Sequence, residues 1–321
     1  MVALPQLLEH LKERPTGHSF TAAPIEEREG IYLALDQSAH PCIFLRAAER
    51  LAGAPIRTSG LLFLPNEEYV LTFENGPAAR GRYHLLACLS SQGSEVESFL
   101  VLVQAFLLQP ATASRDEGMA RLFQSLVRLF AVPPARDLRA ERQGLWGELF
   151  LMSRVRGFEF WAPYWHSEPT RVFDFLGDSR RVEVKTALGP ERVHHFSHKQ
   201  VYGKAGEEIL IASLLLEEDK NGLSLSDLIA DCRERLRESP HCLKVERAAR
   251  QAGMVGTVNM GPSYNPISAE RSLAWFKAND IPHFRLPEPV GVSETRYKAE
   301  LSNAPPLSPM ELDAWLSDWP L

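Results

Sequence analysis

The spacing of apolar residues changes soon after the chain begins. Leu4, Leu7, Leu8 and Leu11 recur at helical intervals, and short apolar runs separated by turn residues follow them. This pattern predicts a β-rich domain over residues 1–115, for which the sequence indicates no chemistry. The expected strands cover residues 31–35, 42–45, 61–64, 69–73, 83–89 and 99–108, with turns at residues 65–66 and 75–77.

A helical pattern then separates this domain from the rest of the chain. Ser114 and Glu117 have the spacing of a capping box, apolar residues follow at helical intervals, and Pro133-Pro134 would end the helix. We therefore predict a linking helix over residues 116–135.

The second half alternates helical and strand-like patterns, which indicates an α/β core with a mixed central sheet flanked by helices. The continuously apolar run 208–216 is typical of a central strand covered on both faces. We place the core over residues 136–240 and a helical and β C-terminal extension over residues 241–321. The other expected strands are 158–165, 171–176, 180–186 and 291–301, and the expected helices are 136–155, 225–238, 243–252, 268–279 and one opening at Ser308-Pro309.

Composition and charge exclude several classes of protein. The chain of 321 residues is 45% hydrophobic and 24% charged, and it contains no run of the roughly 18 apolar residues that a membrane helix needs. The N-terminal pattern does not resemble a signal peptide, so we expect a soluble cytoplasmic protein without a membrane partner. The four scattered cysteines indicate free thiols in a reducing compartment.

The net charge of −6 argues against a protein that coats nucleic acid along its whole surface. Residues 178–204 depart from this average, since six basic residues there outnumber three acidic ones. A local contact with nucleic acid remains compatible with the acidic chain.

Residues 171–186 carry the chemistry that the sequence offers. Glu183 and Lys185 would project from one face of a strand, because successive side chains alternate. A tight hairpin at residues 177–179 would bring Asp174 beside them. Burying these charges requires a compensating partner, and Mg²⁺ held by Asp174, Glu183 and the carbonyl oxygen of Val184 would provide one. Lys185 would then orient a water molecule or a phosphate oxygen.

The order of Asp174, Glu183 and Lys185 resembles the PD-(D/E)XK nuclease signature, with Phe173 where that family often has proline. The resemblance implies hydrolysis of DNA by an endonuclease that uses Mg²⁺, with Mn²⁺ as a substitute. It also implies a metal-site role for Glu148, which stands on the preceding predicted helix.

Further motifs extend the resemblance over about residues 140–215. A glutamine that supports the site recurs after the E-x-K strand in this superfamily, and Gln200 has that place at the start of a predicted helical stretch. The motifs are similar to a group of bacterial PD-(D/E)XK motif proteins associated with restriction and phage defence. That implies DNA as substrate, helicase, ATPase or methyltransferase partner proteins, and a homodimer as one open assembly. The residues expected to contact DNA are Arg181, His195, Ser197 and Lys199.

Two alternatives remain open. The fold could serve as a non-catalytic module that binds DNA or a partner protein. His194, His195 and His198 could instead hold zinc, although Glu does not follow the first histidine as metalloproteases require. A motor ATPase is not expected, because the chain lacks a phosphate-binding G-x-x-x-x-G-K-[ST] loop.

Overall fold

The computed structural model describes residues 4–13, 20–25, 29–47, 55–58, 60–74, 76–108, 137–166, 172–237, 239–254 and 262–319. These residues fall into two compact units. The first holds residues 4–108 and 239–246, and the second holds residues 137–237, 247–254 and 262–319. The linking helix predicted over residues 116–135 lies outside the described residues.

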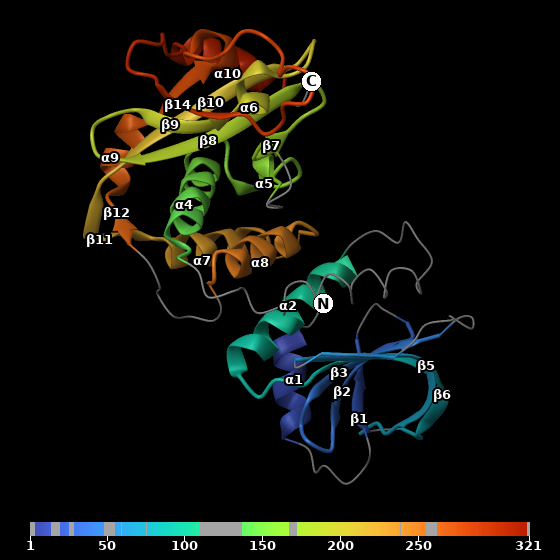
Figure 1. The fold of residues 1–321 in the computed structure, drawn as a ribbon. Helices are drawn as coiled ribbons and strands as arrows, with labels where there is room; N and C mark the ends of the chain where they lie inside the picture. Colours follow the sequence, from blue (N-terminus) through green and yellow to red (C-terminus); the bar gives the residue numbers. More distant parts are fainter. Residues whose placement is uncertain are drawn as a thin grey trace. The chain divides into compact units, whose positions relative to one another are not determined.

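The first unit contains an antiparallel sheet with strand order β1-β2-β3-β6-β5-β4 (Figure 1). The sheet curls until β1 meets the residue after β5, where Thr72 donates to Phe20 O at 3.1 Å and accepts from Ala22 N at 2.8 Å. One face of the sheet buries an aromatic cluster that includes Phe44 and Tyr83. The elements are α1 (Leu4–Lys12), β1 (Phe20–Pro24), β2 (Ile31–Asp36), β3 (Pro41–Arg46), β4 (Ile56–Arg57), β5 (Leu61–Leu71), β6 (Ala79–Cys88) and α2 (Gly93–Leu108).

Two predictions for this unit are wrong. Residues 99–108 form the second part of helix α2 instead of a strand, and the buried Phe99, Val103 and Leu107 stand four residues apart along it. Residues 61–64 and 69–73 do not form two strands with a turn between them. They lie mainly in one strand, β5, which bulges between Leu64 and Glu67. The β-rich character of the domain is confirmed.

The second unit contains a four-stranded mixed sheet with the order β13-β10-β8-β7. Strand β10 pairs parallel with β8 and antiparallel with β13, which confirms the apolar run as a central strand. The elements are α4 (Arg139–Arg154), α5 (Phe158–Trp161), β7 (Phe175–Leu176), β8 (Arg180–Leu188), β9 (Val193–Ser197), α6 (His198–Tyr202), β10 (Glu208–Leu216), β11 (Glu218–Ser224), α7 (Leu225–Arg235), β12 (Ser263–Tyr264), α9 (Pro266–Ser272), β13 (Ala274–Lys277), η1 (Ala278–Asp280), β14 (Arg296–Glu300) and α10 (Pro309–Ser317). Helix α8 (Cys242–Gln251) follows α7 in the chain.

Helix α4 packs between the sheet and α7 (Figure 1). Gly147 allows this close approach, because a Cβ atom at this position would lie 2.4 Å from Thr186 Cγ2 and 3.5 Å from Val184 Cγ1. The absence of a side chain on α4 thus brings the helix against the strand that carries the predicted site.

The opposite face of the sheet is covered by an antiparallel ribbon of β9 and β14 and by α6. Phe196 from β9 and Ala299 from β14 pack in one cluster with Ile211 of the central strand. The segment predicted as a C-terminal extension therefore contributes strand β13 to the sheet and β14 to its cover.

Several predicted elements of this unit need correction. Residues 158–165 form a short helix and turns instead of a strand, with only Trp165 bridging to Phe175. The helix predicted over 268–279 is α9 followed by β13, and the stretch from His194 begins as strand β9 before α6. The strands expected over 171–176 and 291–301 shorten to β7 and β14. The α/β class is confirmed, as are the hairpin at 177–179 and the capped closing helix α10.

Two predictions from composition can also be compared with the structure. The four cysteines are buried free thiols, as expected. Within the described ranges, no helix has the length and the apolar content that crossing a bilayer requires.

Candidate active site

Strand β8 places Glu183 and Lys185 on the face opposite to α4, as the alternation of side chains predicts. Lys185 Nζ lies 2.7 Å from Glu183 Oε1, and both side chains are largely buried. The aliphatic and aromatic surroundings include the ring of Phe196, whose centroid is 5.3 Å from Lys185 Nζ. The ammonium group is thus held between a carboxylate and an aromatic face.

The β7–β8 hairpin brings Asp174 to the same place. Asp174 Oδ2 accepts a hydrogen bond from the backbone N–H of Val184 at 2.7 Å. This bond joins residues ten positions apart along the chain and fixes the carboxylate beside the strand that carries Glu183. The backbone carbonyl of Val184 as a metal ligand stays a prediction.

Helix α4 contributes Glu148 from the other side of the sheet edge. Glu148 Oε2 accepts a hydrogen bond from the indole Nε1 of Trp165 at 2.7 Å, and the Trp165 side chain is fully buried. The same segment is tied to the strand of Asp174, since His166 N donates to Asp174 O at 2.8 Å. Trp165 therefore holds Glu148, and the next residue, His166, binds the backbone of Asp174; no sequence motif indicates Trp165.

The pKa of each of the three carboxyl groups is raised, and the charge of Asp174 adds to the effect of burial at Glu148 and Glu183. Burial is the largest cause for each of them, and it raises the pKa of Asp174 to about 6 and that of Glu183 to about 8. The pKa of Glu148 also lies well above its ordinary value, because burial acts together with the negative charge of Asp174. Lys185 opposes these shifts, but it cannot neutralise three acids. With all three acids ionised the site would carry an excess of negative charge, which a cation would offset.

Gln200 connects the acidic group with helix α6. Its carboxamide nitrogen donates to Glu183 Oε1 at 2.6 Å and to Val172 O at 3.0 Å. Its carboxamide oxygen accepts from Ser197 N at 2.9 Å and from Lys185 Nζ at 3.3 Å. The bond from Ser197 belongs to the capping box of α6, so the cap of the helix and the position of the glutamine depend on each other.

A comparison of the chain with known protein families identifies its family. A family model described as "Putative PD-(D/E)XK family member, (DUF4420)" matches residues 7–302. The chain belongs to this family. Comparisons with curated proteins and with solved structures found no match. The suspected superfamily is therefore confirmed, and the family description covers nearly the entire chain.

The carboxyl groups of this PD-(D/E)XK family member fit a divalent metal ion by their chemistry. Glu183 Oε2 is buried and has no hydrogen-bond partner among the described residues. Carboxylate oxygens are the ligands that Mg²⁺ prefers, and a cation would offset the repulsion between the acids.

The carboxyl groups are not arranged as a complete set of metal ligands. In the described ranges, no group of three His, Cys, Asp or Glu side chains is arranged to hold an ion. Trp165, Val184 and Gln200 each donate a hydrogen bond to one oxygen of these carboxyl groups.

The residues predicted to contact DNA have different surroundings. His195 and Lys199 are exposed, and Ser197 is partly exposed as the N-cap of α6. The guanidinium group of Arg181 is committed to the interior: it lies 3.0 Å from Glu207 Oε1 and donates to Gly177 O at 2.7 Å. All four DNA contacts stay predictions, but Arg181 already has protein partners.

The three histidines of this family member do not converge. His194 and His198 are buried, whereas His195 points to the exposed face of β9. His194 Nε2 lies 2.8 Å from Ser213 Oγ, and the ring of His198 stacks on Tyr202 at 4.9 Å. These contacts favour packing roles over a zinc site.

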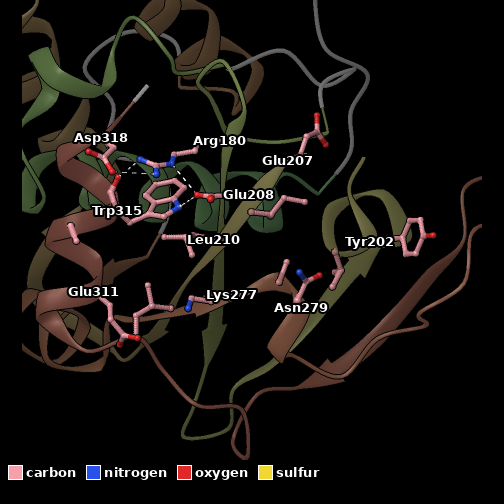
Figure 2. Close-up of a pocket in the computed structure, with 15 residues that line it drawn as sticks. Arg180, Tyr202, Glu207, Glu208, Leu210, Lys277, Asn279, Glu311, Trp315 and Asp318 are labelled. Atoms are coloured by element: carbon pink, nitrogen blue, oxygen red, sulfur yellow. Dashed lines mark hydrogen bonds and ion pairs between the residues drawn. The ribbon is translucent and has the colours of Figure 1, made fainter. Parts of the chain in front are cut away.

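A pocket of about 530 Å³ lies apart from the carboxyl groups, and none of Glu148, Asp174, Glu183 and Lys185 lines it. Figure 2 shows Arg180, Glu208 and Trp315 meeting at one side of this pocket. Glu208 Oε2 accepts from Arg180 Nε at 3.0 Å and from Trp315 Nε1 at 2.9 Å, while Arg180 Nη1 donates to Trp315 O at 2.7 Å. This network fastens α10 to the start of strands β8 and β10.

Proposed function

We propose that this PD-(D/E)XK family member is a Mg²⁺-dependent endonuclease that hydrolyses phosphodiester bonds in DNA. The observation that carries the proposal is the meeting of Glu148, Asp174 and Glu183 around Lys185, with a buried carboxylate oxygen of Glu183 left without a partner. Such a concentration of perturbed acids is typical of a functional site. Buried acids with a purely structural role would lower the stability of the fold, because their desolvation is not compensated.

Asp174, Glu183 and Glu148 would hold the metal ion, and Mn²⁺ would replace Mg²⁺. A bound ion of this kind lowers the pKa of water and offsets the charge that develops on a phosphodiester. We propose that the carbonyl oxygen of Val184 completes the set of ligands.

Lys185 and Gln200 would act on the reacting groups and on their orientation. The ammonium group of Lys185 lies within reach of Glu183 and can orient water or stabilise a phosphate oxygen beside it. Gln200 holds Glu183 and Lys185 in fixed positions through its two ends. The glutamine is therefore a positioning residue.

We also propose a role in restriction or phage defence within the cytoplasm, together with a helicase, ATPase or methyltransferase partner. The acidic chain supports this, because a net charge of −6 limits its own long-range attraction to DNA. A homodimer would place two such sites on one duplex.

The test is cleavage of plasmid and linear DNA with Mg²⁺ or Mn²⁺, compared with EDTA. We expect metal-dependent cutting by the wild type and a loss of at least about 100-fold in the Lys185→Met variant, which keeps the length of the side chain. Lys220→Met is the matched control, because Lys220 is an exposed residue of β11 in the same unit. Its activity should equal that of the wild type.

Absence of cutting would be followed by calorimetry of Mg²⁺ binding. Binding that is lost in Glu183→Gln would retain the metal site and indicate a nuclease that needs its partner. No binding by the folded protein would contradict the proposed enzyme and favour the non-catalytic module.

A further inference from the structure

The β9–β14 ribbon has one buried face and one exposed face. Directly opposed residues of an antiparallel pair share a face, and the register opposes Ser197 to Arg296 and His195 to Lys298. His195, Arg296 and Lys298 are exposed, while Phe196 on the other face is buried against the sheet. The ribbon therefore presents a row of polar and basic side chains to solvent.

This exposed face is basic at the end that approaches the candidate site. Arg296 and Lys298 stand on β14, and the acidic Glu300 of the same face lies at the opposite end, beside Val193. Lys199 lies in the first turn of α6, but the carboxylate of Glu288, which accepts from Thr295 N at 2.8 Å, acts on it, so Arg296 and Lys298 carry the basic character. The net charge of the chain is −6, whereas this part of the strand face is positively charged.

A short chain of contacts links the backbone beside Arg296 to the candidate active site. Arg296 opposes Ser197, whose N–H donates to Gln200 at 2.9 Å. Gln200 in turn donates to Glu183 at 2.6 Å. One backbone pairing and two hydrogen bonds thus separate Arg296 from the candidate metal ligand.

We propose that the exposed face of the β9–β14 ribbon binds the sugar–phosphate backbone of the DNA that the site cleaves, with Arg296 and Lys298 as its main cations. The proposal rests on the function proposed above. Arginine and lysine bind phosphate through charge, and such contacts position a protein on DNA without reading its sequence. The ribbon therefore supplies affinity and orientation, and the carboxyl groups beyond Gln200 supply the chemistry.

The sequence did not indicate this role for β14, because Arg296 and Lys298 lie about 100 residues from the histidine-rich segment that they join. Their contribution depends on the register of a strand pair. A register shifted by one residue would turn both cations toward the core.

The test measures binding of a fluorescent DNA duplex by anisotropy, in EDTA so that cleavage does not occur, over a series of salt concentrations. The double variant Arg296→Gln/Lys298→Gln should bind more weakly than the wild type. Each lost phosphate contact lowers the slope of log K against log salt by about 0.9, so the slope should become shallower by about 2.

A matched control removes one arginine and one lysine elsewhere in the same unit. Arg235 on α7 and Lys220 on β11 are exposed, so Arg235→Gln/Lys220→Gln has the same change in net charge. Its salt slope should equal that of the wild type. Mg²⁺ affinity should be unchanged in the ribbon variant, which would show that its fold and its metal site are intact.

The outcomes separate this proposal from the proposed nuclease. A wild-type slope in the ribbon variant, or no DNA binding by the wild type, would overturn the role of the ribbon. If the wild type neither cleaves DNA nor binds Mg²⁺ but the ribbon variant still shows a reduced slope, the ribbon stays a DNA-binding face and only the proposed enzyme is contradicted.

Discussion

At the scale of single residues, the buried carboxyl group of Glu183 is the least satisfied part of the candidate site. One of its oxygens meets Lys185 and Gln200, and the other is buried without a partner among the described residues. A carboxylate in such surroundings is stabilised only by a cation or by a proton. The raised pKa of about 8 shows that the metal-free site resolves this by holding a proton.

Trp165 belongs to no sequence motif, yet it orients one of the candidate metal ligands. Its indole N–H is bonded to Glu148 at 2.7 Å and favours the ionised form of that carboxyl. We expect Trp165→Phe to weaken Mg²⁺ binding by about 10-fold, because a hydrogen bond to a charged group contributes about 1.5 kcal/mol or more. Calorimetric titration with Mg²⁺ measures this directly.

Trp161→Phe is the control for this prediction. Trp161 is equally buried and its indole donates to Val155 O, so the variant loses a similar ring and hydrogen bond away from Glu148. Equal losses of Mg²⁺ affinity in the two variants would mean that Trp165 acts only through packing.

The residues of the signature could be predicted because local rules determine their relation. Strand alternation places Glu183 beside Lys185, and a tight hairpin returns Asp174. The partners of these residues could not be predicted, since Trp165 reaches Glu148 across a turn and Arg296 reaches Ser197 from a distant strand. Such contacts depend on tertiary packing and register.

At the scale of elements, the contact between α4 and β8 is the least tolerant part of the site. Gly147→Ala would place its Cβ 2.4 Å from Thr186 Cγ2, and Thr186 Oγ1 is held by Gln143 at 3.1 Å. We expect a destabilisation of about 1–3 kcal/mol from overpacking, which exceeds the gain of about 1 kcal/mol in helix propensity. Urea unfolding monitored by tryptophan fluorescence measures the balance.

Two further variants identify the cause. Gly147→Ala/Thr186→Ser removes the opposing methyl group and should recover most of the lost stability. Gly144→Ala lies on the same helix with nothing within 4 Å of its Cβ, so it should stabilise the protein slightly. If Gly144→Ala destabilised as much as Gly147→Ala, helix geometry and not the contact with Thr186 would be responsible.

The wrong element predictions share one physical reason. Apolar runs such as residues 99–108 and 158–165 satisfy strand patterns locally, because short runs do not distinguish the two periods. In the structure, the side chains of Phe99, Val103 and Leu107 are buried four residues apart, which is helical spacing. Residues 274–277 became strand β13 because the edge of β10 offered a partner, which no local rule reveals.

At the scale of the whole molecule, protons and metal ions compete for the carboxyl groups of the second unit, and this competition affects its stability. The pKa of Asp174 is raised to about 6 and that of Glu183 to about 8, so the folded site binds more protons than the unfolded chain between about pH 4 and pH 8. The contribution of these two groups to the stability of the metal-free protein is therefore greatest below this range and falls as the pH rises through it. Mg²⁺ needs the deprotonated carboxylates, so its stabilising effect should grow in the same direction.

Scanning calorimetry of the full chain tests this competition. Because each unit has its own core, we expect two unfolding transitions, and only that of the second unit should move with pH and with Mg²⁺. In EDTA its midpoint should be lower at about pH 8 than at about pH 5.5, and Mg²⁺ at about 100 times its Kd should restore about 2.7 kcal/mol.

Glu183→Gln removes the acid that titrates near pH 8, so the unfolding transition of the second unit in this variant should depend less on pH and respond little to Mg²⁺. A shift of both transitions, or an equal response in Glu183→Gln, would mean that the ion binds at another place. Either outcome would contradict a metal site at the carboxyl groups around Lys185.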